Sequence, residues 1–288
     1  MKGRLNKKVP LYTTIFPVTF WLILLVAIPL IYVLVLSFLT RLPNGRVDFV
    51  FTMANYKKLI NPDYFHIYGI SLFVSAVTTA ICIVLSYPFA WFIAQGSERK
   101  KTLMMLLVII PFWTNSLIRL YGWKTILGNE GVLNKVLLTL HLINEPIQML
   151  YSLPAVILGM VYTLLPFMIL PIYASVEKLD KTLLEAANDL GAKSIQSFLQ
   201  ISLPLTSPGI FAGSIMVFIP TLGYFFVSDL LGGGNTMMVG NLIKNQFYTA
   251  QNWPLGAALS IVLIIMTLLL VRIYTLMGGK LDDLGVAK

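Results

Sequence analysis

Charged residues are scarce in this chain. Only 11% of its 288 residues are Asp, Glu, Lys or Arg, less than half of the about 25% that soluble domains carry. Hydrophobic residues make up 57% of the chain, and the mean hydropathy is +0.82. A water-soluble domain is therefore excluded, and the length is better counted in membrane spans.

Cysteine and histidine are nearly absent. Cys82 is the only cysteine and lies within an apolar run, so neither an intrachain disulfide nor a thiolate metal site can form. His66 and His141 are far apart in the chain and have no partner at ligand spacing. We expect both to be solvated loop residues, and we expect neither a metal site nor a cofactor.

A nucleotide-binding loop is missing as well. The nearest fragment to G-x-x-x-x-G-K-[ST] is Gly278-Gly-Lys280, which is followed by Leu281. The chain is therefore not expected to be an enzyme, and any ATP must be hydrolysed by a partner. The formal net charge of +9 is spread over the ends of apolar runs, so nucleic-acid binding is not expected either.

Long apolar runs are what the chain has instead. Six stretches contain no Asp, Glu, Lys or Arg, and a helix needs about 20 residues to cross the hydrocarbon core. The third stretch is short, so its span is expected to continue past Arg119. The prediction is an all-α membrane protein in which residues 1–288 form one domain, with spans at about 15–39, 67–95, 103–126, 153–176, 207–228 and 254–276.

Lysine and arginine predict the orientation of the spans. The two tails and the even-numbered loops hold thirteen of these residues, and the odd-numbered loops hold eight. Because loops on the cytoplasmic side are enriched in Lys and Arg, both termini are expected in the cytoplasm. The apolar stretch behind basic residues 1–8 is too long for a cleaved signal peptide, so we expect an uncleaved first span.

The segment between the fourth and fifth spans, residues 180–204, has helical features. Thr182 and Glu185 have the spacing of a capping box that starts a helix. Gly191 is suited to the left-handed conformation that ends one, and a second short helix is expected from Ser194 until Pro204 stops it. By periodicity alone, such a pair could simply rest on the lipid surface.

The identities and spacing of the residues in this segment favour another interpretation. Glu185-Ala-Ala, then Gly191, then Ile201-x-Leu-Pro204 resembles the cytoplasmic-loop signature of permease subunits in ABC importers. The resemblance implies the type I ABC importer permease fold, with six transmembrane helices and a loop of coupling helices that dock on an ATPase subunit. It also implies that Glu185, Ala186, Ala187 and Gly191 carry the contact.

Five further motifs are Tyr87-Pro-Phe-Ala-Trp-Phe92, Pro111-Phe-Trp-Thr-Asn-Ser-Leu-Ile-Arg119, Leu165-Pro-Phe167, Val176-Glu-Lys-Leu-Asp180 and Val227-Ser-Asp-Leu230. They are similar to motifs of the PotB-type permeases of spermidine/putrescine importers. The similarity covers about residues 50–275 and implies a cell (inner) membrane location, with polyamine as substrate. It implies four kinds of partner: two copies of an ATPase subunit, a second, PotC-like permease subunit, an extracytoplasmic substrate-binding protein, and membrane lipid.

A passage for a polycation needs acidic groups and aromatic faces. Asp229 ends the run that begins at Tyr224, at the expected extracytoplasmic end of span five, and ionised groups at the edge of a span are functional candidates. Trp113 and Asn115 lie beside Pro111 and, like Tyr224, could face the pathway. Asp229 could instead be an interfacial anchor, Trp113 could be packed or lipid-facing, and Arg119 is expected to snorkel to the interface.

Two classes of function remain at this point. The first is the permease subunit of an ABC importer that takes up polyamines by ATP-driven alternating access, with another small solute as the alternative cargo. The second is a secondary transporter or channel that works alone. That class needs charged ion sites inside the spans, and the interiors of the six runs contain none.

Overall fold

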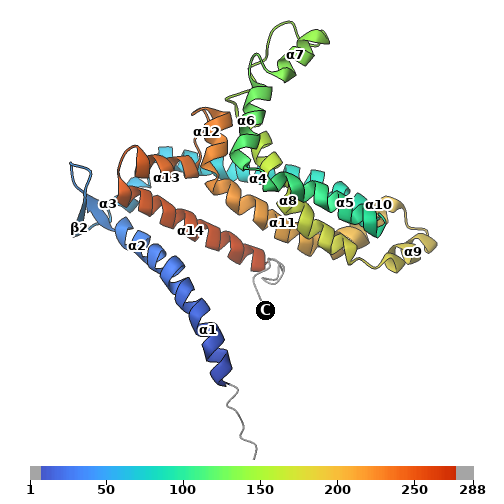
Figure 1. Ribbon diagram of the computed structural model, residues 1–288, viewed down its shortest axis with the longest axis horizontal. Helices are drawn as coiled ribbons and strands as arrows, with labels where there is room; N and C mark the ends of the chain where they lie inside the picture. The colour runs from blue at the N-terminus through green and yellow to red at the C-terminus, as the bar shows by residue number, and fades with distance from the viewer. Residues whose placement is uncertain (1–7, 277–288) are drawn as a thin grey trace, which may run out of the picture. The chain divides into compact units, whose positions relative to one another are not determined.

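The computed structural model describes residues 8–276, and their side chains from residue 15 onward (Figure 1). Residues 1–7 and 277–288 lie outside the described part. Most of the Lys and Arg residues of the two tails, from which the orientation is predicted, therefore also lie outside it. The chain divides into two compact units, residues 1–62 with 243–265 and residues 63–242 with 266–288.

The first unit contains a long apolar helix and a hairpin. Helix α1 (Lys8–Leu22) continues through a π-helical turn at Ile23–Ala27 into α2 (Ile28–Ser37). The antiparallel hairpin of β1 (Leu39–Arg41) and β2 (Val47–Phe51) follows, and then the short α3 (Ala54–Lys58). The small core of the unit consists of Leu36, Leu39 and Ala257, with Val33, Val47 and Phe247 packed against it.

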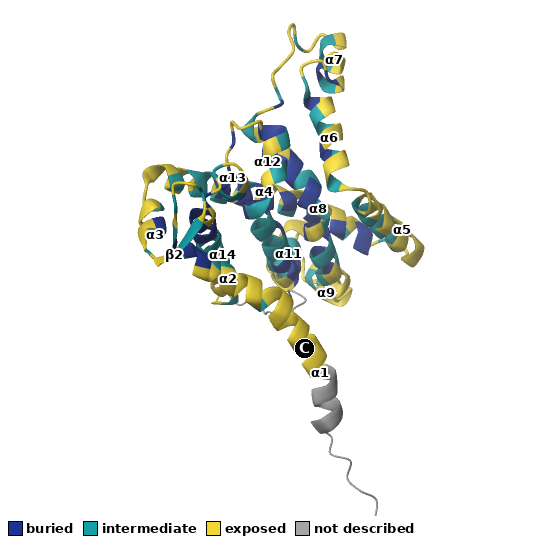
Figure 2. Cartoon of the chain, turned by 60° about the vertical axis from the view of Figure 1, so that its left-hand side comes forward, coloured by how far each residue is buried: buried dark blue, intermediate teal, exposed yellow. Residues whose placement is uncertain are grey.

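Helix α1–α2 has almost no protein around it. The most apolar window of Ile15–Ser37 is 0% buried, and Figure 2 shows its surface as exposed. Apolar surface of this extent is stable only against lipid or a partner protein.

The second unit is built around α4 (Pro62–Ala94), α8 (Leu153–Glu177) and α11 (Leu203–Gly223). One core cluster combines Cys82, Ala90, Leu164, Met168 and Val217, which come from all three helices. At Gly209 of α11 an added Cβ would collide with the Pro171 carbonyl of α8. Small residues at such crossings allow membrane helices to approach closely.

The remaining helices belong to the second unit or cross the boundary between the two units. They are α5 (Glu98–Ile109), a 3-10 turn (Ile110–Trp113), α6 (Ser116–Leu127), α7 (Val132–Thr139), α9 (Lys181–Asp189), α10 (Ser194–Ser197), α12 (Phe225–Gly232), α13 (Val239–Tyr248) and α14 (Trp253–Leu276). Within the second unit, α12 packs against α6 and α8, in a second cluster that includes Leu120, Val156, Val227 and Leu231.

Five helices of the described chain are long and apolar enough to cross a membrane. They are Ile15–Ser37, Pro62–Ala94, Leu153–Glu177, Ser194–Gly223 and Trp253–Leu276, and a bent pair at Glu98–Thr139 makes six if it counts as one span. Several buried hydroxyls inside these helices bond to carbonyls one turn back, as Thr79 does to Ser75 (2.7 Å) and Thr163 to Gly159 (2.7 Å). Such bonds satisfy the side chain without water.

Two predicted spans are not single helices. The third, predicted at 103–126, bends by 90° between Trp113 and Ser116, where the Thr114 hydroxyl donates to the Pro111 carbonyl (2.7 Å). The fifth, predicted at 207–228, ends at Gly223, and residues 225–228 belong to α12. The reason is a close backbone contact, because a Cβ at Gly240 would lie 2.5 Å from the Gly223 carbonyl oxygen.

Candidate functional site

The 180–204 segment begins with a helix that Asp180 caps. The Asp180 carboxylate accepts a hydrogen bond from the Thr182 backbone N–H (3.0 Å), and α9 starts at Lys181. The predicted capping box at Thr182 and Glu185 is therefore wrong, because the carboxylate one residue before the helix already satisfies the first-turn amide. Hydrogen bonds from Thr182, first of all from its backbone, lower the pKa of Asp180 below its usual value.

Gly191 ends this helix in the way the sequence predicts. Its φ of +81° is left-handed, its N–H donates to the Asn188 carbonyl (2.9 Å), and the Ala192 N–H donates to the Ala187 carbonyl (3.0 Å). This pair of bonds is a Schellman motif, which favours glycine at the left-handed position. The chain therefore turns at a fixed angle between α9 and the helix that follows, and we call this turn the Gly191 elbow.

The surface of α9 is open. Glu185 and Ala186 are exposed, Ala187 is half-buried, and Leu190 is 89% exposed. A leucine so far from any core, beside a face of small alanines, is typical of a surface that another protein covers.

The second helix of the segment does not stop at Pro204. Helix α10 (Ser194–Ser197) passes through a π-helical turn at Phe198–Ser202 directly into α11, and Pro204 lies in the first turn of α11. The sequence prediction was wrong here because a π-helical turn changes the bonding register, and a proline in the turn that follows lacks only a donor.

Aromatic side chains attach the segment to the bundle. Trp91 of α4 lines a cavity of about 450 Å³ together with Leu184 and Glu185 of α9. The ring of Tyr87, one turn back, packs edge-on against Phe198 at 5.3 Å between ring centres, and its hydroxyl lies 2.9 Å from that of Thr206. The segment is thereby fixed to the end of α4.

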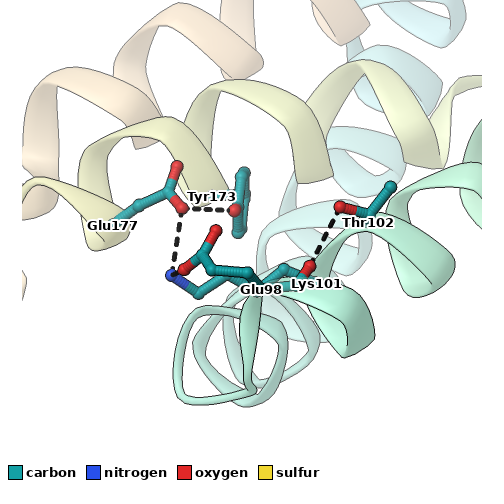
Figure 3. A network of polar contacts seen from close by, with 5 residues as sticks. All are labelled: Glu98, Lys101, Thr102, Tyr173 and Glu177. Atoms are coloured by element: carbon teal, nitrogen blue, oxygen red, sulfur yellow. Dashed lines mark hydrogen bonds and ion pairs between the residues drawn. The ribbon is translucent and has the colours of Figure 1, made fainter.

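A polar network lies beside the same cavity (Figure 3). Lys101 of α5 donates to the carboxylates of Glu98 (2.9 Å) and Glu177 (3.2 Å), and the Tyr173 hydroxyl donates to Glu177 (2.6 Å). Glu177 ends α8, and three residues separate it from α9. Sequence reasoning counted Lys101 only as a topological charge, since its partner is 76 residues away.

Two of the predicted pathway residues, Trp113 and Asn115, lie at the bend between α5 and α6. The Asn115 side chain caps α6 by accepting from the Leu117 N–H (2.8 Å). Trp113 is 81% exposed, so it is not packed against the part of the chain that the structure describes.

The other two, Tyr224 and Asp229, lie at the break between α11 and α12. Tyr224 connects these helices and is half-buried. Asp229 is exposed in the middle of α12, not at the end of span five as predicted. Because α12 and α6 pack against each other, the structure brings together the helices that follow the two breaks.

Asn241 of α13 orients Asp229, and sequence reasoning missed it. Its amide donates to the Asp229 carboxylate (2.6 Å) and to the Phe225 carbonyl (3.0 Å). Its oxygen accepts from the Ser228 hydroxyl (2.5 Å) and the Met238 N–H (3.0 Å). No pattern around a single Asn in α13 indicates this role, which depends on how the chain returns to α12.

Arg119, which the sequence predicted to snorkel to the interface, lies over two aromatic rings. Its guanidinium carbon lies 5.0 Å from the centre of the Phe112 ring and 5.5 Å from that of Tyr162. Its Nε is buried and has no hydrogen-bond partner among the residues that the structure describes. Cation–π contacts therefore hold this positive charge at the bend.

Curated relatives match nearly the whole chain. The spermidine/putrescine transport system permease protein PotB of Salmonella typhimurium is 48% identical over 269 residues, which cover 92% of this chain and 94% of that protein. PotB of Escherichia coli K12 is 49% identical over 254 residues, covering 88% and 92%. The inner membrane ABC transporter permease protein YdcU of Escherichia coli is 35% identical, covering 79% and 76%.

Solved structures share the fold. One is a bacterial ABC transporter involved in the import of the acidic polysaccharide alginate, with a TM-score of 0.77, 18% identity, and coverage of 99% of this chain and 100% of that one. A second, of the bacterial alginate transporter in complex with an alginate pentasaccharide-bound periplasmic protein, has a TM-score of 0.76, 17% identity, and coverage of 96% and 97%.

The fold class predicted from the sequence, an all-α membrane protein of the ABC importer permease type, is thereby confirmed. The model of the binding-protein-dependent transport system inner membrane component family matches residues 76–283. The chain belongs to this family, so it is a multi-pass membrane permease component and not an enzyme.

Proposed function

We propose that this chain is the permease subunit through which spermidine and putrescine enter the cell in an ATP-driven ABC importer. The observation that carries the proposal is the 48% identity to a spermidine/putrescine permease over 92% of this chain. At this identity and coverage, the same chemistry is expected along the passage. YdcU, whose name states no cargo, is more distant at 35%.

The partners follow from what this chain lacks and what it exposes. It has no nucleotide-binding loop. Helix α9 presents exposed Glu185 and Ala186, and exposed Leu190 follows directly at its end. We assign this face, with Ala187 and Gly191, to docking on one of two ATPase subunits on the cytoplasmic side. The apolar surface of α1–α2 would face lipid or a second, PotC-like permease subunit. A substrate-binding protein would deliver the polyamine from outside.

Alternating access then follows from the docking. ATP-dependent closure of the two ATPase subunits would move α9, and the Gly191 elbow and the Trp91 contact would pass that movement to the membrane helices. Asp229, Tyr224, Trp113 and Asn115 are proposed to line the outer part of the passage, where a carboxylate and aromatic faces suit an alkylammonium.

Co-purification tests the docking assignment. A tagged chain, expressed with its neighbouring genes and solubilised in mild detergent, should retain the ATPase subunit. Leu190→Asp should remove it, because a new charge in the docking face loses apolar contact and must be desolvated. Leu142→Asp is the matched control, since Leu142 is 66% exposed and lies outside the segment. Equal ATPase recovery with both variants would contradict the assignment.

A further inference from the structure

The ammonium of Lys101 joins two helices that are distant in sequence. It lies within hydrogen-bond distance of Glu98 on its own helix and of Glu177 on α8 (Figure 3). The Lys101 side chain is only 16% exposed, whereas those of Glu98 and Glu177 are 87% and 40% exposed. The lysine is therefore packed between the helices, and its charge is the shared element of the network.

The network lies next to the docking segment. Lys101 and Glu177 line the cavity of about 450 Å³ whose other wall includes Lys181 and Glu185 of α9. Only residues 178–180 separate Glu177 from α9. A displacement of α9 can therefore reach the last turn of α8 through these three residues. Tyr173 and Lys101 hold that turn through the same Glu177 oxygen.

Stability gives no sufficient reason for this arrangement. Ion pairs with exposed partners contribute little to folding, because water and salt screen them. They do restrict the relative position of the elements that they join. Here the joined elements are the last turn of α8 and the first turn of α5, and α5 leads to the bend at Trp113.

We infer that Lys101 is a positioning residue for coupling, which makes α5 move with α8 and the 180–204 segment when the ATPase subunits close. This inference rests on the proposed function, because it needs a docked ATPase. Without the ammonium, α9 still docks and ATP is still hydrolysed, but the movement reaches α5 less fully. ATP hydrolysis then continues, while the uptake per ATP hydrolysed falls.

Lys101→Met tests this, because methionine keeps most of the aliphatic stem and removes the charge. In proteoliposomes with the complete transporter, the uptake of radiolabelled spermidine per ATP hydrolysed should fall by roughly threefold or more, as expected for the loss of a coupled pair. Lys100→Met is the matched control, since Lys100 is an exposed neighbour on the same helix. Lys101→Arg should restore most of the ratio.

Glu177→Gln in the Lys101→Met background should add little, because both changes remove the same contact. Equal ratios for Lys101→Met and Lys100→Met would overturn the inference. So would a lower membrane abundance of Lys101→Met with an unchanged ratio, which would make the residue merely structural. A failure of the proposed docking is seen separately, because the ATPase would then be absent from the parent complex as well.

Discussion

Asp229 combines accessibility with a fixed orientation. Its carboxylate is exposed on α12, and the Asn241 amide donates to it at 2.6 Å. A carboxylate and an ammonium 4 Å apart attract each other by about 4 kcal/mol at an effective dielectric constant of about 20. Desolvation reduces this to roughly 1–3 kcal/mol, as for hydrogen bonds to charged groups.

Asp229→Asn keeps the shape of the side chain and removes its charge. Polyamine uptake should therefore fall by about tenfold or more if the carboxylate lies on the path. The measurement is radiolabelled spermidine uptake in cells, with membrane abundance checked by blot. Glu130→Gln, in the exposed loop between α6 and α7, is the control. Undiminished uptake in Asp229→Asn would make the residue an interfacial anchor.

At the residue scale, whether a role can be predicted from the sequence depends on how far away in the chain the hydrogen-bond partners of the residue lie. Gly191 is predictable, because the hydrogen bonds of its turn join Gly191 to Asn188 and Ala192 to Ala187, which are all close in the chain. The cap of α9 is also local, but two acceptors compete, and Asp180 wins over Thr182. The roles of Lys101 and Asn241 are not predictable, because they depend on contacts with other helices, to Glu177 and to Asp229.

The elbow between α9 and α10 is the element on which coupling depends. Gly191→Val should strain it, because a β-branched residue is strongly disfavoured at a positive φ. Nothing lies within 4 Å of a Cβ at this position, so the effect should come from the backbone alone. Uptake and transport-stimulated ATPase activity should fall together, while the subunit still reaches the membrane.

Gly191→Asn is the graded control for this experiment. Asparagine adopts the left-handed conformation more readily than other side chains, so its loss of uptake should be clearly smaller than that of valine. Normal uptake with valine, or equal losses with both residues, would show that the conformation of the elbow does not matter for coupling.

The helices themselves were largely visible in the sequence, and their breaks were not. A long apolar run predicts a helix in the membrane, because its backbone N–H and C=O groups can bond only to each other there. The break at Tyr224 depends on the approach of Gly240 to the Gly223 carbonyl, which is a tertiary contact. The passage of Pro204 into α11 likewise depends on the π-helical turn before it.

At the scale of the whole molecule, the orientation in the membrane decides which partners meet which surface. A reporter fused after Lys288 and one inserted near Lys101 should both be cytoplasmic, and one near Asn61 should be outside, because Lys and Arg favour the cytoplasmic side. The Asn61 and Lys101 sites flank α4, a single helix of 33 residues. Finding both on the same side of the membrane would contradict the six-span arrangement.

The central claim is that this chain passes polyamines only as part of an ATP-driven complex. The most direct measurement is the accumulation of radiolabelled spermidine in proteoliposomes that contain the purified complex, with binding protein outside and ATP inside. We predict accumulation that needs both ATP and binding protein, and that unlabelled putrescine inhibits while a neutral sugar does not. Accumulation by this chain alone under an ion gradient, or ATP-driven uptake that excludes spermidine, would contradict the account.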